Sequence, residues 1–155
     1  GWRIGYAAGP AEIIAAMTNI QSQSLSNPTS ISQKASVAAI NGPKDFIEMM
    51  VREFQKRRDY IVRRLNTIKG ISCYNPKGAF YAFPKVSGLY GRRYASDIIQ
   101  NSLDITSFLL KEALVAVVPG MAFGADDYVR LSFATSMANI EKGLDRIEAS
   151  TGKLV

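Results

Sequence analysis

Residues 44–70, KDFIEMMVREFQKRRDYIVRRLNTIKG, form the most regular stretch of this sequence. The apolar positions are Ile47, Met50, Val51, Phe54, Ile61, Leu65 and Ile68. They recur at helical spacing, which predicts one long amphipathic helix. Lys69 and Gly70 suit its end, because a cation near the last carbonyls is favourable and glycine tolerates the left-handed conformation.

Shorter patterns follow this helix. Residues 71–74 and 79–83 are β-like runs on either side of a turn-forming Asn-Pro-Lys-Gly, so we expect them to pair as a hairpin. Residues 86–93 are irregular and contain two glycines. This segment predicts neither a helix nor a strand.

The last third of the chain returns to helical spacing around two strands. A helix capped by Ser102 should run to about Ala113, followed by an apolar strand over residues 114–118. Residues 128–133 predict another strand, and Ser136 should cap a final amphipathic helix. Strands enclosed by helices in this order predict an α+β domain.

The segment before the long helix has a different organisation. Residues 2–8 predict a short strand, and residues 11–20 a helix that follows a proline. A polar loop over residues 22–30 leads to a second helix, which Ser30 can cap and which stops at Asn-Gly-Pro, residues 41–43. We therefore predict two domains, residues 1–42 and residues 43–155.

Composition limits the possible functions. The 155 residues are 47% hydrophobic and 21% charged, enough for an ordinary domain with a buried core. No apolar run approaches the roughly 20 residues that cross a bilayer, so we expect a soluble, cytoplasmic protein without a membrane partner. Cys73 is the only cysteine and histidine is absent, which excludes zinc sites and Ser-His or Cys-His nucleophilic machinery within this chain.

The net charge of +6 raises the possibility of nucleic-acid binding. The basic residues concerned are Arg52, Lys56, Arg57, Arg58, Arg63 and Arg64. They alternate with acidic residues along the long helix, which is typical of a solvated face. We therefore expect no nucleic-acid partner, while small anionic substrates remain compatible with the charge.

Two arginines are candidates for binding an anion. Arg3 lies two residues from a glycine on either side, and its fork could contact a phosphate or carboxylate, although an arginine in a short strand is commonly a surface residue. Arg130 is the lone cation of an apolar strand, where a charge is costly unless paired. Arg130 therefore meets either a structural carboxylate or an anionic ligand.

Five segments in order resemble the class I pyridoxal-phosphate aminotransferases of fold type I, and in particular the bacterial and plastid aspartate aminotransferase branch. They are GWRIGY (1–6), SNPTS (26–30), GAFYAFP (78–84), VVPGMAFG (117–124) and VRLSFA (129–134). The resemblance extends from residue 1 to about residue 149. It implies a small C-terminal α+β domain, residues 43–155, preceded by a strand-and-helix remnant of the large cofactor-binding α/β domain, residues 1–42.

The resemblance also implies roles for single residues. Arg3 matches the arginine that binds the phosphate of the cofactor, pyridoxal 5'-phosphate. Arg130 matches the arginine that binds the substrate α-carboxylate, and Phe80 matches an aromatic residue beside the substrate. Ser26 and Asn27 match a segment at the dimer interface near the active sites, so the resemblance places them among the substrate-binding residues.

The lysine that forms the Schiff base in this family is placed before Gly1 by the resemblance. No catalytic residue is therefore expected in this chain, and we expect the chain alone to be inactive. In one branch of the family an arginine binds the distal carboxylate of aspartate across the dimer. Ser22 stands at that position here, so dicarboxylate selection must depend on another residue.

The function implied is transfer of the amino group from L-aspartate, or a related amino acid, to 2-oxoglutarate by a homodimeric enzyme. Two other possibilities stay open within the resemblance. One is an aminotransferase of another specificity, for aromatic amino acids or prephenate, and the other is a non-enzymatic ligand-sensing domain of a transcription regulator. An α+β interaction domain with coincidental motifs is the third alternative.

Overall fold

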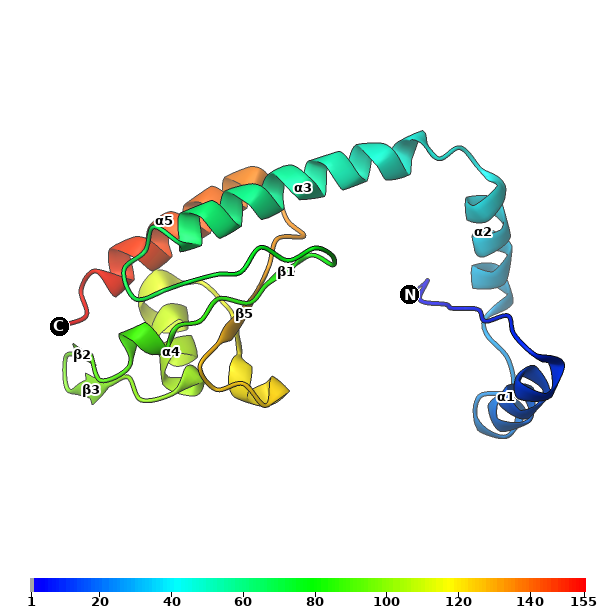
Figure 1. Cartoon of the computed structure of the whole chain (residues 1–155), viewed down its shortest axis with the longest axis horizontal. Helices are drawn as coiled ribbons and strands as arrows, with labels where there is room; N and C mark the ends of the chain where they lie inside the picture. The colour runs from blue at the N-terminus through cyan, green and yellow to red at the C-terminus, as the bar shows by residue number, and fades with distance from the viewer. Residues whose placement is uncertain (1) are drawn as a thin grey trace. The chain divides into compact units, whose positions relative to one another are not determined.

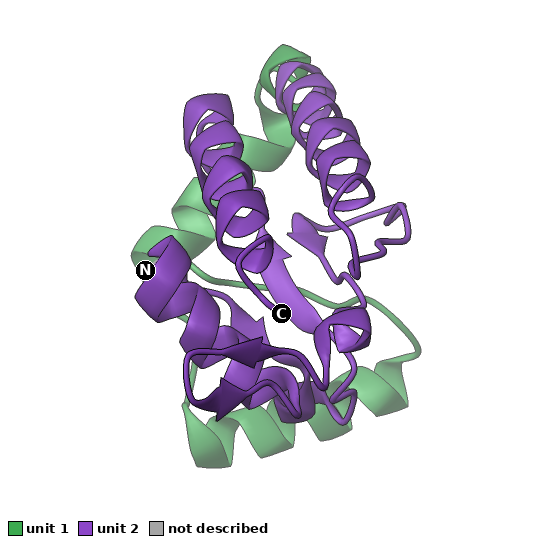
Figure 2. Cartoon of the chain, turned by 90° about the vertical axis from the view of Figure 1, so that its left-hand side faces the viewer, with its two compact units in different colours: residues 1–47 green, residues 48–155 purple. Residues whose placement is uncertain are grey.

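The computed structural model describes residues 2–155, so Gly1, with which the first motif opens, lies outside the described residues. The chain forms two compact units, residues 1–47 and residues 48–155 (Figure 2). Helix α3 (Asp45–Leu65) begins in the first unit and continues in the second. The assignment of residues 1–42 and 43–155 to the large and small domains of an enzyme stays a prediction.

The first unit contains two helices, α1 (Ala11–Ser24) and α2 (Ser30–Asn41). Both were expected, but α1 continues four residues beyond its predicted end at Ile20, so that the loop begins only at Leu25. The predicted strand over residues 2–8 is wrong, because these residues have no regular secondary structure. A strand requires a neighbour for its backbone hydrogen bonds, and residues 2–8 have none within the described chain.

The start of α2 also differs from the prediction. Thr29, not Ser30, is the N-cap residue, and its side chain makes no capping hydrogen bond. Gln33 Nε2 instead donates to the carbonyl of Pro28 at 2.8 Å. A side chain inside the first turn therefore ties the helix to the preceding loop.

The second unit is built on a three-stranded antiparallel sheet in the order β1-β5-β4. The strands are β1 (Tyr81–Ala82), β5 (Val129–Ser132) and β4 (Val118–Pro119). Ala82 pairs with Leu131, and Val118 pairs with Arg130. The central strand is therefore β5, which the sequence predicted as residues 128–133.

Within the second unit, α5 (Met137–Thr151) runs alongside the C-terminal part of α3 (Figure 1). Arg64 of α3 joins them by donating to Asp145 at 2.7 Å and to Glu148 at 3.0 Å. Ser136 caps α5 as predicted, since its hydroxyl accepts from the Asn139 N–H at 3.2 Å. The buried core includes Ile61, Leu65, Ala82, Val129, Leu131, Phe133, Ile140, Leu144 and Ile147.

The predicted long helix is confirmed, with its end at Leu65 rather than near Ile68. Gly70, in the turn that follows, has a left-handed φ of 88°, the conformation that glycine tolerates. The apolar stripe is buried only in its C-terminal part, because Ile47 and Val51 are more than half exposed while Leu65 is 1% exposed.

The predicted hairpin of residues 71–74 with residues 79–83 is wrong. Ser72 forms an isolated antiparallel bridge to Lys85, which lies beyond residues 79–83, and β1 pairs with β5 instead. Pairing with β5 places Ala82 in the core at 0% exposure. Burial of apolar surface thus selects the distant partner over the nearby one.

Helix α4 (Ser102–Phe108) continues into the π-helical segment η2 (Leu109–Ala113), which ends where the sequence predicted. Its N-cap is Asn101, not Ser102, because the Asn101 side chain accepts from two backbone N–H groups. The strand predicted over residues 114–118 is wrong except at Val118, because β4 consists of Val118 and Pro119. Leu114 has a left-handed φ of 53°, which ends the helix and prevents an extended conformation at that position.

The remaining short elements were not predicted. The 3-10 turn η1 (Ser87–Leu89) lies in the irregular region, and β2 (Arg93–Tyr94) pairs with β3 (Asp97–Ile98) in a small antiparallel ribbon. After β4, the 3-10 turn η3 (Gly120–Phe123) leads back toward β5. Among residues 2–155, no helix combines the length and the apolar character needed to span a membrane.

Candidate functional site

Arg130 lies in the middle of the central strand, on the face of the sheet opposite the core. Its neighbours Val129 and Leu131 are buried, whereas Arg130 is half-buried, as strand alternation requires. The guanidinium carbon lies 4.4 Å from the ring centre of Tyr81 and 4.8 Å from that of Phe123. The cation is thus flanked by aromatic rings from the elements on both sides of β5.

The carboxylates closest to Arg130 in the sequence are engaged elsewhere. Asp126 accepts hydrogen bonds from Ser102, at 2.6 Å from the hydroxyl and 3.0 Å from the N–H. Asp127 pairs with Lys85 at 3.4 Å. Within residues 2–155, the side chain of Arg130 forms no ion pair and donates no hydrogen bond. Its planar set of N–H donors is therefore available to an anion.

The turn that carries Phe123 is held by close packing at its first residue. The Gly120 N–H donates to the carbonyl of Tyr128 at 2.8 Å, and its own carbonyl accepts from the Ala125 N–H at 3.0 Å. A Cβ on Gly120 would lie 2.1 Å from the oxygen of Ala125. Only glycine fits at this point, and the turn is consequently fixed against the loop before β5.

A polar network fixes the other side of the same loop. Ser102, which is fully buried, donates to Asp126 and accepts from the Met121 N–H at 3.2 Å. The two hydrogen bonds from Ser102 hold the pKa of Asp126 below its usual value. The Tyr90 hydroxyl donates to the Asp126 carbonyl, and burial together with the charges of Asp126, Asp127 and Asp104 raises the pKa of Tyr90 to about 12.

Phe80 begins the chain segment that continues into β1. Its ring centre lies 4.5 Å from that of Tyr81 and 6.4 Å from that of Phe54, and its carbonyl accepts from the Phe133 N–H at 2.9 Å. The side chain remains 41% exposed. Phe80 is thus linked to the surroundings of Arg130 through the Tyr81 ring.

The other three predicted site residues belong to the first unit. Arg3 is exposed and lies in a segment without regular secondary structure. Ser26 has a left-handed φ of 63°, and Asn27 donates its N–H to the carbonyl of Leu25 at 2.8 Å. No hydrogen bond or ion pair among the described residues links the side chains of Arg3, Ser26 and Asn27.

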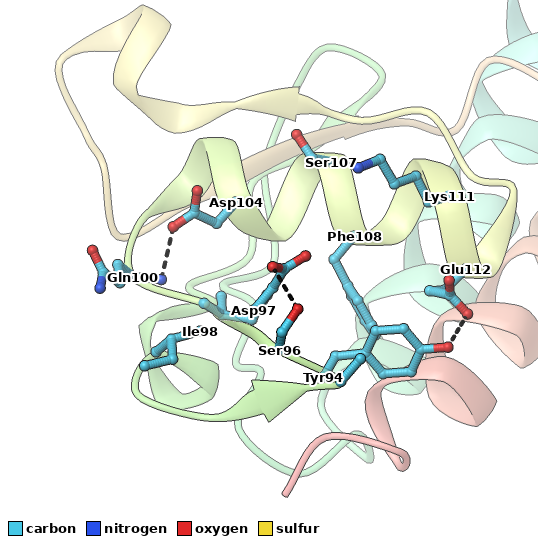
Figure 3. A pocket seen from close by; sticks show the side chains of 12 residues that line it. Tyr94, Ser96, Asp97, Ile98, Gln100, Asp104, Ser107, Phe108, Lys111 and Glu112 are labelled. Carbon is cyan, nitrogen blue, oxygen red and sulfur yellow. Dashed lines mark hydrogen bonds between the residues drawn. The ribbon is translucent and has the colours of Figure 1, made fainter.

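A separate hollow of about 620 Å³ lies between the β2–β3 ribbon and the α4–η2 helix (Figure 3). Its carboxylates have partners within the hollow. Glu112 accepts from the Tyr94 hydroxyl, and Asp104 accepts from the Gln100 N–H at 2.9 Å. None of the predicted site residues lines it, and no cluster suited to a metal ion exists among the described residues.

Sequence reasoning missed Tyr81 and Phe123, the two rings against Arg130. Both lie inside segments that were singled out as motifs, GAFYAFP and VVPGMAFG, and both are aromatic residues close to a glycine. Their positions in those segments were a usable signal. Their convergence on one cation depends on strand pairing, which the motifs do not specify.

Comparisons with known proteins identify similar chains. The model of the family described as aminotransferase class I and II matches residues 1–147. A Rickettsia felis protein named probable aspartate/prephenate aminotransferase is 50% identical over 155 residues, covering 99% of this chain and 38% of its own length. The match therefore leaves most of that relative's length without a counterpart in this chain.

Solved structures show the same similarity. The crystal structure of the aspartate aminotransferase from Rhizobium meliloti superposes with a TM-score of 0.93 at 48% identity, covering 99% of this chain and 39% of that one. The aromatic aminotransferase from Pyrococcus horikoshii superposes with a TM-score of 0.81 at 36% identity, covering 96% of this chain and 38% of that one. This chain thus spans 38–39% of the length of these proteins.

Proposed function

Because this chain belongs to the class I and II aminotransferase family, we propose that it forms the C-terminal part of an enzyme that transfers the amino group of L-aspartate, or of a related amino acid, to 2-oxoglutarate. Its fold is that of the fold type I aminotransferases, as the sequence predicted. Residues 1–42 would then belong to the large cofactor-binding domain and residues 43–155 to the small domain.

The observation that carries this proposal is that Arg130 has no carboxylate partner among the described residues. It is a half-buried cation on the face of the sheet opposite the core, and no carboxylate among residues 2–155 pairs with it. Leaving a guanidinium without a partner is costly, and a carboxylate matches its planar fork with two parallel hydrogen bonds. An amino acid and a 2-oxo acid both supply such a carboxylate.

Arg3 suits the phosphate of pyridoxal 5'-phosphate. Its side chain is exposed and forms no ion pair within the described residues, so its donors are available to a phosphate. When bound, this cofactor supplies the electron sink for the reaction at the substrate α-carbon. In this proposal Arg3 binds the cofactor phosphate and Arg130 binds the substrate carboxylate. The lysine that the resemblance places before Gly1 would transfer the proton at the substrate α-carbon.

The remaining assignments follow the same family pattern. Phe80 would lie beside the substrate, and Ser26 and Asn27 near the active site at the interface of a homodimer. The enzyme would work in the cytoplasm on small-molecule substrates. Without the upstream lysine, the 155-residue chain alone would not carry out transamination, so it serves as the negative control in assays.

The test is Arg130→Ala in the full-length protein that carries this chain. We expect the Kd for 2-oxoglutarate, measured by calorimetry, to rise roughly 30-fold, equivalent to about 2 kcal/mol for a charge-assisted contact. Arg52→Ala makes the same change of charge on the exposed face of α3 and should leave the Kd within about two-fold, as surface charges contribute little.

The same experiment defines what would contradict the proposal. An Arg130→Ala protein that binds 2-oxoglutarate as tightly as the wild type would rule out the carboxylate role. Assaying L-aspartate as donor, with 2-oxoglutarate and prephenate as alternative acceptors, would define the specificity, since the name of the Rickettsia felis relative contains aspartate and prephenate.

A further inference from the structure

Arg130 has two aromatic neighbours that come from opposite sides of its strand. Tyr81 belongs to β1 and Phe123 to η3, which follows β4, and β5 lies between β1 and β4 in the sheet. The ring centres lie 4.4 and 4.8 Å from the guanidinium carbon. Both distances are well inside the range of about 6 Å over which a ring attracts a cation.

The two rings act on the guanidinium in a different way from a carboxylate. A ring positioned over a guanidinium attracts it through its π-face and accepts none of its conventional N–H hydrogen bonds. The guanidinium of Arg130 donates no hydrogen bond within residues 2–155, so its edge stays available. The rings therefore restrict the position of a long, flexible side chain without competing for its donors.

Each ring is itself held in place. Phe123 meets the Phe83 ring edge-on at 6.0 Å, and Phe83 stacks on Tyr128 at 5.1 Å. Tyr81 contacts the Phe80 ring at 4.5 Å. The turn carrying Phe123 is additionally fixed by the packing of Gly120 and by the hydrogen bonds of Ser102. The rings thus provide a prearranged position for the cation.

We propose that Tyr81 and Phe123 are positioning residues that hold the Arg130 guanidinium in place to bind a substrate α-carboxylate. This inference rests on the proposed function, since it assumes that Arg130 binds that carboxylate. Prearrangement reduces the side-chain ordering that binding would otherwise require, so its loss weakens affinity without removing a direct contact.

The experiment uses the full-length protein loaded with its cofactor and the variants Tyr81→Leu and Phe123→Leu. We expect each to raise the Kd for 2-oxoglutarate, measured by calorimetry, by roughly 3- to 20-fold, the effect of losing one ring over a cation. Tyr81→Phe retains the ring and should stay within about two-fold of the wild type. Tyr74→Leu is the matched control, because it removes a tyrosine ring that is 77% exposed and that pairs with neither Arg130 nor the rings around it among the described residues.

A second readout separates positioning from general damage to the fold. L-Aspartate is compared with 3-aminopropanoate, which is aspartate without its α-carboxylate. In the two leucine variants kcat/KM should fall by roughly 3- to 20-fold for aspartate and stay unchanged for 3-aminopropanoate. An equal fall for both donors would overturn the positioning role.

Two further outcomes are decisive. If Arg130→Ala weakens binding but both leucine variants bind like the wild type, the positioning role is wrong and the proposed function stands. If Arg130→Ala has no effect, the proposed function itself fails. Should a leucine variant not fold, pentafluorophenylalanine at position 123 keeps an aromatic ring there while reversing its attraction for a cation, and it should weaken binding in the same direction.

Discussion

Gly120 links the backbone of one turn to the chemistry of the candidate site. A side chain there would collide with the carbonyl oxygens of Ala125 and Tyr128, at 2.1 and 2.3 Å from its Cβ. Both oxygens belong to backbone, which cannot move away as a flexible side chain can. The absence of a side chain at residue 120 therefore decides where Phe123 lies relative to Arg130.

Gly120→Ala should consequently lower the free energy of unfolding of the full-length protein by about 1–3 kcal/mol, the usual cost of overpacking. Denaturant titration measures this change, and calorimetry should show weaker 2-oxoglutarate binding in the same variant. Gly143→Ala is the matched control, since a Cβ on Gly143 meets nothing within 4 Å in the middle of α5. The control should be neutral or stabilising by up to about 1 kcal/mol. Equal stability of the two variants would contradict the packing argument.

At the scale of elements, helix α4 is tied to the loop before β5 by one buried hydroxyl. Ser102 donates to the Asp126 carboxylate through its hydroxyl and N–H, and accepts from the Met121 N–H. Ser102 was predicted as a helix cap, but Asn101 has that role. The shift of one residue frees the Ser102 side chain to join two segments that are distant in sequence.

Asp126→Asn tests this connection through its pH dependence. The pKa of Asp126 is lowered in the folded protein by the hydrogen bonds from Ser102. Its carboxylate therefore stabilises the fold above the unfolded pKa of about 4, and this contribution is lost as the pH falls through the lower folded value. The wild type should be more stable than Asp126→Asn at pH 7, and the difference should shrink below about pH 4.

Urea titrations between pH 7 and pH 3 measure this difference. Asp97→Asn is a suitable control, because the Asp97 carboxylate is exposed and accepts only a 3.4 Å hydrogen bond from Ser96. The free energy of unfolding of Asp97→Asn should equal that of the wild type at neutral pH. A stability difference for Asp126→Asn that is independent of pH would show that Ser102 does not favour the charged carboxylate.

At the scale of the whole molecule, the first unit has little core of its own. Among its described residues only Ser32 is buried. Its exposed apolar side chains are Trp2, Ile4, Tyr6, Ile13, Met17, Ile20, Leu25, Ile31, Val37, Ile40, Phe46 and Ile47. Exposed apolar area of this kind marks a surface that another chain segment or molecule covers.

The isolated 155-residue chain should therefore self-associate in solution. Light scattering over a range of concentrations measures this, and an average mass that rises with concentration is expected. The chain shortened to residues 48–155, the second compact unit, is the informative comparison and should associate less. A concentration-independent monomer of the complete 155-residue chain would contradict the expectation.

The local features of this protein were readable from the sequence. The long helix α3, the cap of α5 by Ser136 and the central strand with Arg130 at its middle all follow from spacing and residue type, since these depend on near neighbours along the chain. The order of the five motifs along the chain likewise indicates the aminotransferase family, which the family match confirms.

Tertiary structure alone decided which strands pair and which side chains become neighbours. Strand β1 pairs with β5 and not with residues 71–74, and in this pairing Ala82 is fully buried in the core. The same pairing brings Tyr81 to one side of Arg130, while the packing of Gly120 brings Phe123 to the other. Sequence spacing specifies which face of a strand a side chain occupies, but the identity of its neighbour depends on which distant segments share a core. The arginine was therefore evident from the sequence, and the rings that flank it were not.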